Sequence, residues 1–107
     1  MQDFGLRPMR TPSVGLGMVD TNLEAIVAAR LRAIMQELGL RYDELGDMCG
    51  VTRSVISNWV NCYNLPEVRE ATELCEKTGI TLDWLYRGHL GGMDPKLAAR
   101  LAKWMGA

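Results

Sequence analysis

The chain is poor in the residues that build metal sites and disulfide frameworks. It holds three cysteines, Cys49, Cys62 and Cys75, and a single histidine, His89. The cysteine count is odd and no two cysteines form a C-x-x-C pair, whereas a zinc site needs ligands at closer spacing. We therefore expect no metal and no cofactor, and interpret the three thiols as small, reduced, buried or half-buried residues.

Long apolar runs and a targeting signal are also missing. No stretch approaches the ~18 consecutive apolar residues of a membrane span. The chain does not open with a basic segment followed by an apolar one, as a secretory signal would. These absences predict a cytoplasmic protein without membrane contact.

An excess of positive charge is the third thing the chain lacks. Twelve Lys and Arg face 13 Asp and Glu, which gives a net charge of −1. A basic footprint normally supplies non-specific affinity for nucleic acid, so the total charge argues against such a partner. The total does not report how charge is distributed between faces, however, and a polarised surface remains compatible with it.

What the chain does have is helical periodicity over the length of one domain. The apolar content is 48%, with one Phe, so Leu, Ile, Met and Ala must fill a small core. Thr21 and Glu24 form a capping-box pattern, which predicts a helix that Gly39 ends. Further helices are expected over 42–49, 53–60, 66–78, 82–87 and 94–105.

These elements divide the chain into three parts. Residues 1–20 contain several prolines and glycines without periodicity, which predicts a flexible leader. Residues 21–88 form the main domain, and residues 89–107 form a hinge followed by an amphipathic helix. The predicted helices 42–49 and 53–60 are joined by the short turn Gly50–Thr52, and two helices so joined are typical of a helix-turn-helix. In such units the second helix lies in the DNA major groove.

The pattern is specific enough to point to a family. The segment LGLRYDELGDMCGVTRSVISNWVNCYNLP, followed by ITLDWLYRG, resembles the DNA-binding domain of the phage lambda repressor and Cro family. The resemblance covers about residues 22–88 and is strongest at Gly50-Val51, Ser57-Asn58-Trp59, Leu65-Pro66 and the segment 82–85. It implies an all-α fold, a compact five-helix helix-turn-helix domain to which this chain adds a C-terminal helix.

The segment 53–60 would be the recognition helix. Ile56 and Trp59 fall three residues apart and would hold it to the core. Its polar residues project from the opposite side, where Arg suits guanine, Asn suits adenine and Ser suits either. By resemblance the base-contacting residues are Arg53, Ser54, Ser57 and Asn58. A plain solvated face is the alternative interpretation. Expected phosphate contacts are Arg41, Tyr42, Thr52, Asn61, Tyr63 and Asn64.

Several positions depart from the family pattern. A glycine usually follows the recognition helix, where this chain has Cys62 and Tyr63. Family members often carry an Arg–Glu ion pair where this chain has Met35 and Val60, and the joint replacement by apolar residues suits an intact packed fold. Residues 22–88 hold seven basic and ten acidic side chains, so the main domain carries a net charge of −3.

The C-terminal helix is the expected protein-contact element. Its apolar side comprises Leu97, Leu101, Trp104 and Met105. That side docks on its own domain, pairs with a second copy, or belongs to a tail that frays because about 11 residues make a short helix.

Together these features predict a phage-like, repressor-like regulator that binds specific double-stranded DNA as a homodimer. No nucleophile motif or phosphate loop accompanies the acidic residues, so we expect no enzymatic activity and no small-molecule ligand. The low basic content supports an alternative: a protein-interaction module on the same fold, which binds another regulator, a toxin or polymerase instead of DNA.

Overall fold

The computed structural model describes residues 22–105, so the leader expected over 1–20 lies outside the described residues. The order of elements is α1 (Leu23–Leu38), α2 (Tyr42–Cys49), α3 (Arg53–Val60), α4 (Val68–Thr78), α5 (Leu82–Arg87), α6 (Pro95–Ala102) and the 3₁₀ turn η2 (Lys103–Met105). Residues 22–105 contain no strand. The all-α class with an additional C-terminal helix is thus confirmed. Within the same range, no helix has the length and apolarity needed to cross a membrane.

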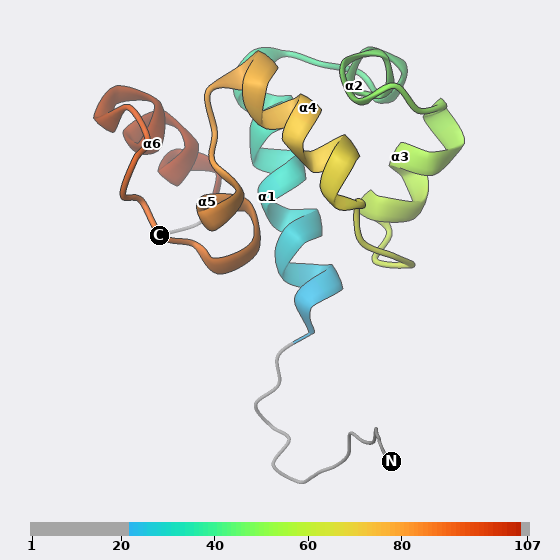
Figure 1. Ribbon diagram of the computed structural model, residues 1–107, viewed down its shortest axis with the longest axis horizontal. Coiled ribbons are helices and arrows are strands. Elements are labelled where there is room, and N and C mark those ends of the chain that lie inside the picture. The colour runs from blue at the N-terminus through green and yellow to red at the C-terminus, as the bar shows by residue number, and fades with distance from the viewer. Residues whose placement is uncertain (1–21, 106–107) are drawn as a thin grey trace, which may run out of the picture.

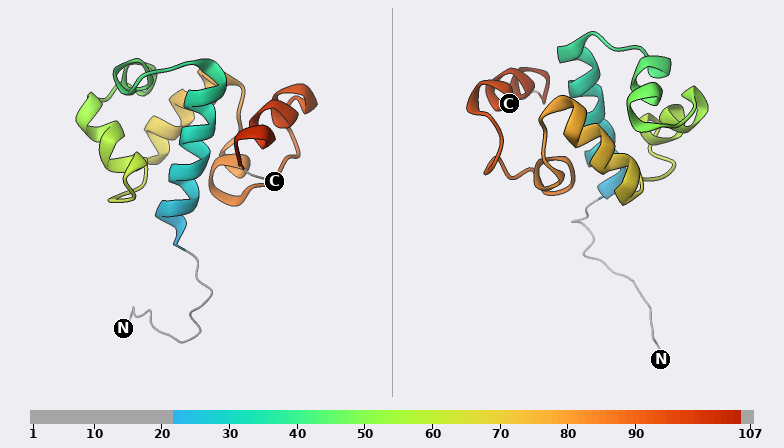
Figure 2. Two further views of the ribbon diagram at one scale, coloured as in Figure 1. Left: turned by 180° about the vertical axis from the view of Figure 1, so that it is seen from behind. Right: turned by 45° about the horizontal axis from the view of Figure 1, so that its top comes forward.

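Helix α1 forms the centre of the molecule. Helices α2 and α3 lie on one side of it, and α5 and α6 lie on the other, in all three views (Figures 1 and 2). Its residues contact α3, α5, α6 and η2. Leu31 and Ile34 of α1 are fully buried and pack in one core with Ile56 of α3 and Leu85 of α5. Each such side chain stabilises the fold by about 1.5–3 kcal/mol through removal of apolar surface from water.

The helix boundaries follow local capping chemistry. Thr52 and Thr81 cap α3 and α5, because the Oγ1 of Thr52 accepts from Val55 N–H at 3.4 Å and that of Thr81 accepts from Trp84 N–H at 3.0 Å. The predicted cap at Thr21 is wrong: Asn22 caps α1, and its Oδ1 accepts from Ala25 N–H at 3.1 Å. Adjacent Thr and Asn are comparable caps, so the sequence alone does not choose between them.

Helix α4 begins later than the position of Pro66 predicted. Glu67 is its N-cap, and the backbone N–H of Glu67 donates to Glu70 Oε1 at 3.0 Å in a capping box. Pro66 is buried before the helix, where its carbonyl accepts a hydrogen bond from the Tyr86 hydroxyl at 2.9 Å. Pro66 therefore does not start α4. It ties the segment just before α4 to Tyr86 of α5 through this hydrogen bond.

The turn between α2 and α3 depends on Gly46. The backbone N–H of Val51 donates to Gly46 O at 2.9 Å, which brings the turn against α2. A Cβ at position 46 would lie 2.6 Å from Val51 O, a backbone atom with little freedom to move. A glycine at this buried position thus sets how closely α3 approaches α2.

Helix α6 docks on its own domain, as the first of the alternatives predicted. Leu97 and Leu101 are buried in the core, and Met105 packs against it. The Trp104 indole N–H donates to Glu37 Oε1 at 2.9 Å, and Arg100 Nε pairs with Glu37 Oε2 at 3.0 Å. Leu97 and Leu101 are therefore not available as a dimer surface, which corrects that part of the expected interface.

The three thiols occupy different environments. Cys49 is buried and Cys75 is half-buried, as expected, but Cys62 is exposed. Burial raises the pKa of the Cys49 thiol to about 11 and also raises that of Cys75. Cys49 and Cys75 are thus protonated packing residues at neutral pH.

Candidate nucleic-acid interface

Helix α3 has one buried and one exposed side. Ile56, Trp59 and Val60 are 0%, 3% and 6% exposed and face the core. Arg53, Ser54 and Asn58 are exposed, and Ser57 is half-buried. The expected division of the helix is confirmed. Three of the four residues predicted to contact bases are therefore exposed on the side of α3 away from the core, and the fourth, Ser57, is half-buried.

Arg53 stacks on the first residue of the preceding helix. Its guanidinium carbon lies 5.6 Å from the centre of the Tyr42 ring, and Tyr42 itself packs against the core. A cation–π contact at an exposed site contributes about 0.5–1 kcal/mol. The ring therefore restrains Arg53 and joins the beginnings of α2 and α3 into one surface.

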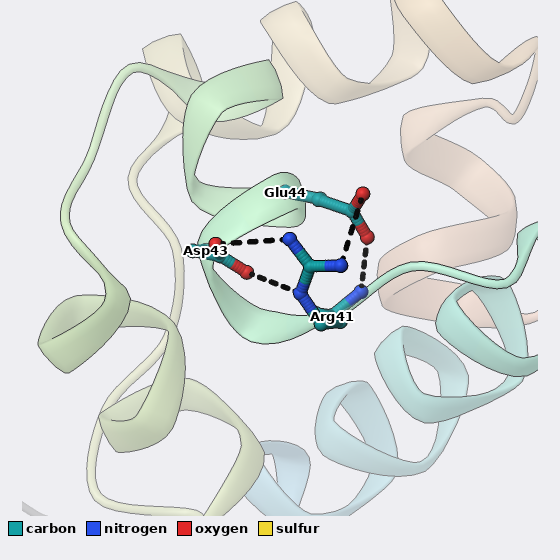
Figure 3. Close-up of polar contacts among 3 residues, drawn as sticks. All are labelled: Arg41, Asp43 and Glu44. Carbon is teal, nitrogen blue, oxygen red and sulfur yellow. Dashed lines mark hydrogen bonds and ion pairs between the residues drawn. The ribbon is translucent and has the colours of Figure 1, made fainter.

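Arg41 is paired with acidic neighbours of its own helix (Figure 3). Its Nε and Nη2 donate to Asp43 at 3.2 and 3.3 Å, and its Nη1 lies 3.7 Å from Glu44 Oε2. Its backbone N–H also donates to Glu44 Oε1 at 2.8 Å. The hydrogen bond from Arg41 lowers the pKa of the Asp43 carboxyl, so this carboxylate stays charged. Arg41 lies at the start of α2, as expected, but the carboxylates of Asp43 and Glu44 already balance its positive charge.

Ser57 and Asn61, both predicted to contact DNA, are hydrogen-bonded to each other at the end of α3. The side-chain amide of Asn61 donates to Ser57 O at 2.9 Å and to Ser57 Oγ at 3.1 Å. The sequence predicted that Ser57 contacts a base and that Asn61 contacts a phosphate. The Ser57 hydroxyl retains its own proton as a donor, whereas the Asn61 carbonyl oxygen can only accept.

The end of α3 is a Schellman motif with a cysteine in the left-handed position. Cys62 has φ 70°, and its N–H donates to Trp59 O at 3.2 Å. The N–H of Tyr63 donates to Asn58 O at 2.9 Å, which completes the motif. This geometry explains why glycine is usual here and turns Tyr63 into solvent, where it is 75% exposed. Asn64 is exposed beside it.

One basic residue of this region was missed by sequence reasoning. Arg32 of α1 donates from Nη1 to Val60 O at 3.2 Å and so caps the C-terminal end of α3. A cation at a helix C-terminus is favourable because the last carbonyls carry partial negative charge. Nothing in the local pattern around Arg32 indicates this contact, which joins residues 28 positions apart.

Charge is distributed unevenly around the molecule. A hollow on the side of α1, α2 and α3 is lined by Arg41, Arg53 and Asp43 over the apolar floor of Met35, Leu40 and Tyr42. An adjoining hollow includes Arg32. A third depression, between α2 and α4, contains Asp47, Glu70 and Glu73, together with Arg69 and Lys77. Arg41 and Arg53 thus line one hollow at the starts of α2 and α3, where Asp43 lies beside them.

The comparisons with known proteins agree with this geometry. A family model described as Helix-turn-helix matches residues 31–85, slightly more than half of the chain. The match runs from the middle of α1 into α5 and includes the whole of α2 and α3. No individual curated protein and no solved structure matches the chain.

Proposed function

The chain belongs to the lambda repressor and Cro-like helix-turn-helix family, and from this premise we propose that it is a sequence-specific, repressor-like transcriptional regulator. The DNA reader would be the domain over residues 21–88, with residues 89–107 serving association between two copies. The observation that carries the proposal is the exposed row of Arg53, Ser54 and Asn58 on a helix whose other side is fixed in the core.

In this proposal α3 enters the major groove. Arg53, stacked on Tyr42, presents two donors to O6 and N7 of a guanine, and Asn58 pairs with an adenine. Ser54 contacts an adjacent base, and Ser57 donates its hydroxyl proton. Because the Tyr42 ring already restricts Arg53, less conformational entropy is lost when the guanidinium binds.

Phosphate contacts would fix the register of the helix. Thr52, at the N-terminus of α3, and Tyr42, at the start of α2, would contact phosphate at one end of the recognition helix, and Tyr63 and Asn64 would do so beyond its other end. Asn61 contributes only if its amide leaves Ser57. Arg41 contributes only in exchange for its contacts with Asp43 and Glu44.

Repression would follow from occupancy of DNA in the cytoplasm, with no cofactor, small-molecule ligand or chemical step. One domain with few free cations binds DNA weakly, so two copies acting together on two half-sites would supply the affinity. We propose the homodimer on this ground.

Selection from a pool of random duplexes tests the proposal. The purified protein should enrich a two-part sequence, and fluorescence anisotropy on the enriched duplex should show affinity that falls steeply with added salt. Absence of binding at low salt and tens of micromolar protein, on the order of a Kd above 10⁻⁴ M, would refute it.

One observation favours the alternative function of a protein-interaction module. Asp43 and Glu44 balance Arg41 at a helix N-terminus where a phosphate would otherwise sit. If the module binds another regulator, a toxin or polymerase, the double variant Asp43→Asn/Glu44→Gln should weaken that binding. For a DNA-binding protein the same variant should strengthen duplex binding, because it frees a cation and removes two anions.

A further inference from the structure

Arg32 is an exposed cation that α1 places beside the recognition helix. Its Nη1 donates to Val60 O at 3.2 Å, and it makes no other hydrogen bond and no ion pair within residues 22–105. Four other cations each pair with a carboxylate at 3.0–3.8 Å: Arg41, Lys77, Arg87 and Arg100. Within the described part of the chain, the charge of Arg32 is therefore not balanced by a carboxylate, whereas theirs is.

Arg32 also belongs to the same surface as Arg53. It lines a hollow of about 360 Å³, together with Met35, Leu40 and Tyr42. The same three residues line the neighbouring hollow that includes Arg53, and the Arg53 guanidinium stacks on the Tyr42 ring. The two hollows therefore adjoin, and both arginines border one continuous surface at the starts of α2 and α3.

The chemistry of this position suits a phosphate group. A guanidinium stays charged at neutral pH and binds phosphate oxygens through two N–H groups at once. Only Nη1 of Arg32 has an acceptor among the described residues, so Nε and Nη2 can donate to a second one. Arg32 projects from α1 and not from the helix expected in the groove. A backbone phosphate is therefore its expected partner, and a base edge is not.

We infer that Arg32 is a phosphate-binding residue of the proposed DNA-binding surface. One N–H of its guanidinium stays on Val60 O while the others bind a phosphate of the duplex. The side chain thus links the sugar–phosphate backbone directly to the C-terminal end of α3. The inference rests on the proposed function, and it adds a residue of α1 to the contacts expected there from α2, α3 and the loop after α3.

Arg32 is better placed for this role than Arg41. Arg41 must first leave Asp43 and Glu44, so its gain at a phosphate is offset by the contacts that it loses. Arg32 gives up no carboxylate within the described residues. Its hydrogen bond to Val60 O already restricts the side chain, so less conformational entropy is lost when it binds.

The salt dependence of DNA binding tests the inference. Fluorescence anisotropy with the duplex enriched by selection, at several salt concentrations, gives the slope of log Kd against log salt. Arg32→Ala should reduce this slope by about one and weaken binding roughly five- to tenfold at about 0.1 M salt. The loss should be equal on all single-base variants of the duplex, since a phosphate carries no sequence information.

Lys96→Ala is the matched control for the loss of one positive charge. Lys96 is exposed on α6, which lies at the other end of the molecule from α3 (Figure 1). This variant should keep the wild-type slope. An equally reduced slope in Lys96→Ala would show that only the net charge matters, and it would overturn the inference.

Two further variants separate phosphate binding from the capping of α3. Arg32→Lys keeps a cation and should keep the wild-type slope, even where its hydrogen bond to Val60 O is lost. Arg32→Met keeps an apolar stem without charge and should show the reduced slope, so it replaces Arg32→Ala if that variant does not fold. A wild-type slope in Arg32→Met would leave Arg32 as a helix cap alone and overturn the inference.

The outcomes also separate this inference from the proposed function. Wild-type binding whose slope is unchanged in the uncharged Arg32 variants would remove the phosphate contact and leave the regulator proposal intact. A loss confined to one base pair would make Arg32 a base contact and overturn the inference in the same way. Absence of duplex binding by the wild type would overturn both.

Discussion

Helices α3 and α6 are each eight residues long, and each fixes one side in the core. They differ in what they present outward. Helix α3 exposes an arginine, a serine and an asparagine, whereas α6 exposes Ala99 and Ala102 together with Lys96 and Arg100. Polar side chains with directed donors suit base edges, and uncharged small side chains suit a packed protein surface. One molecule thus carries two outward surfaces with different chemistry at its two ends.

The difference also concerns how each helix is held. Helix α3 is fixed by the short turn at Gly46, by its own apolar residues and by Arg32 at its C-terminal end. The end of α6 is held by polar contacts of Trp104 and Arg100 with Glu37. We therefore expect changes around α3 to affect folding and the proposed DNA contacts, and changes around Glu37 to act through the docking of the C-terminal segment.

Among the variants considered, Ile56→Asp should cause the largest loss of folding stability. Ile56 is 0% exposed, and an unpaired carboxylate there costs several kcal/mol, on the order of the whole stability of such a domain. Far-UV circular dichroism should show loss of helix at room temperature. Ser54→Asp, on the exposed side of the same helix, should remain folded. A cooperative, native-like melt of Ile56→Asp would show that the buried side of α3 is misassigned.

The next largest effect should be the loss of DNA-binding free energy in Arg53→Ala. Loss of a two-pronged contact to guanine costs about 1–3 kcal/mol and relaxes preference at one base pair. Binding to a set of single-base operator variants measures this. Lys96→Ala removes the same charge from α6 and should leave base preference unchanged. An equal loss of affinity for every duplex in the set would make Arg53 a phosphate contact instead.

Cys62→Gly should stabilise the protein. A left-handed conformation costs a residue with a side chain about 1–2 kcal/mol, and glycine returns about 0.5–1 kcal/mol of this through its more flexible unfolded state. The expected net gain is about 0.5–1 kcal/mol in urea denaturation, with the end of α3 unchanged. Cys62→Val should be less stable than the wild type, since a β-branched residue fits a φ of 70° poorly. A less stable glycine variant would contradict the assignment.

The smallest effect concerns pH and the docking of η2. The hydrogen bond from Trp104, with the charges of Lys103 and Arg100, lowers the pKa of Glu37. The ionised carboxylate therefore stabilises docking above its unfolded pKa of about 4.3, and this contribution is lost as pH falls through the lower folded value. Denaturant melts between neutral pH and about pH 3 should show the loss. Glu37→Gln should remove this component, and an unchanged pH dependence would show that Glu37 does not hold the segment.

The sequence predicted local features well where a single residue type marks them. The ends of α1 and α2 follow from Gly39 and Gly50, and the start of α3 follows from Thr52, because left-handed turns and side-chain caps are short-range requirements. The spacing of Ile56 and Trp59 likewise predicted the inner side of α3. The start of α4 was misplaced because Pro66 fits the position before a cap as well as the first turn.

Contacts between distant segments were beyond prediction from pattern alone. The spacing of Leu97 and Leu101 showed an apolar side but not its destination, which depends on Glu37 in α1. Arg32 could be placed at Val60 only once α1 and α3 were packed together. The pairing of Arg41 with Asp43 and Glu44 involves near neighbours, so their acidic character was a signal available in the sequence. The roles of the reading residues at DNA stay predictions.

Because Trp104 is hydrogen-bonded to Glu37, its fluorescence can report whether the C-terminal segment is docked. Trp59 and Trp84 are 3% and 5% exposed, whereas Trp104 is 44% exposed. An aqueous quencher such as iodide therefore reaches one indole of the three before the others. Release of η2 from α1 would expose Trp104 further and shift its emission to longer wavelength. Tryptophan fluorescence therefore follows C-terminal docking without an attached dye.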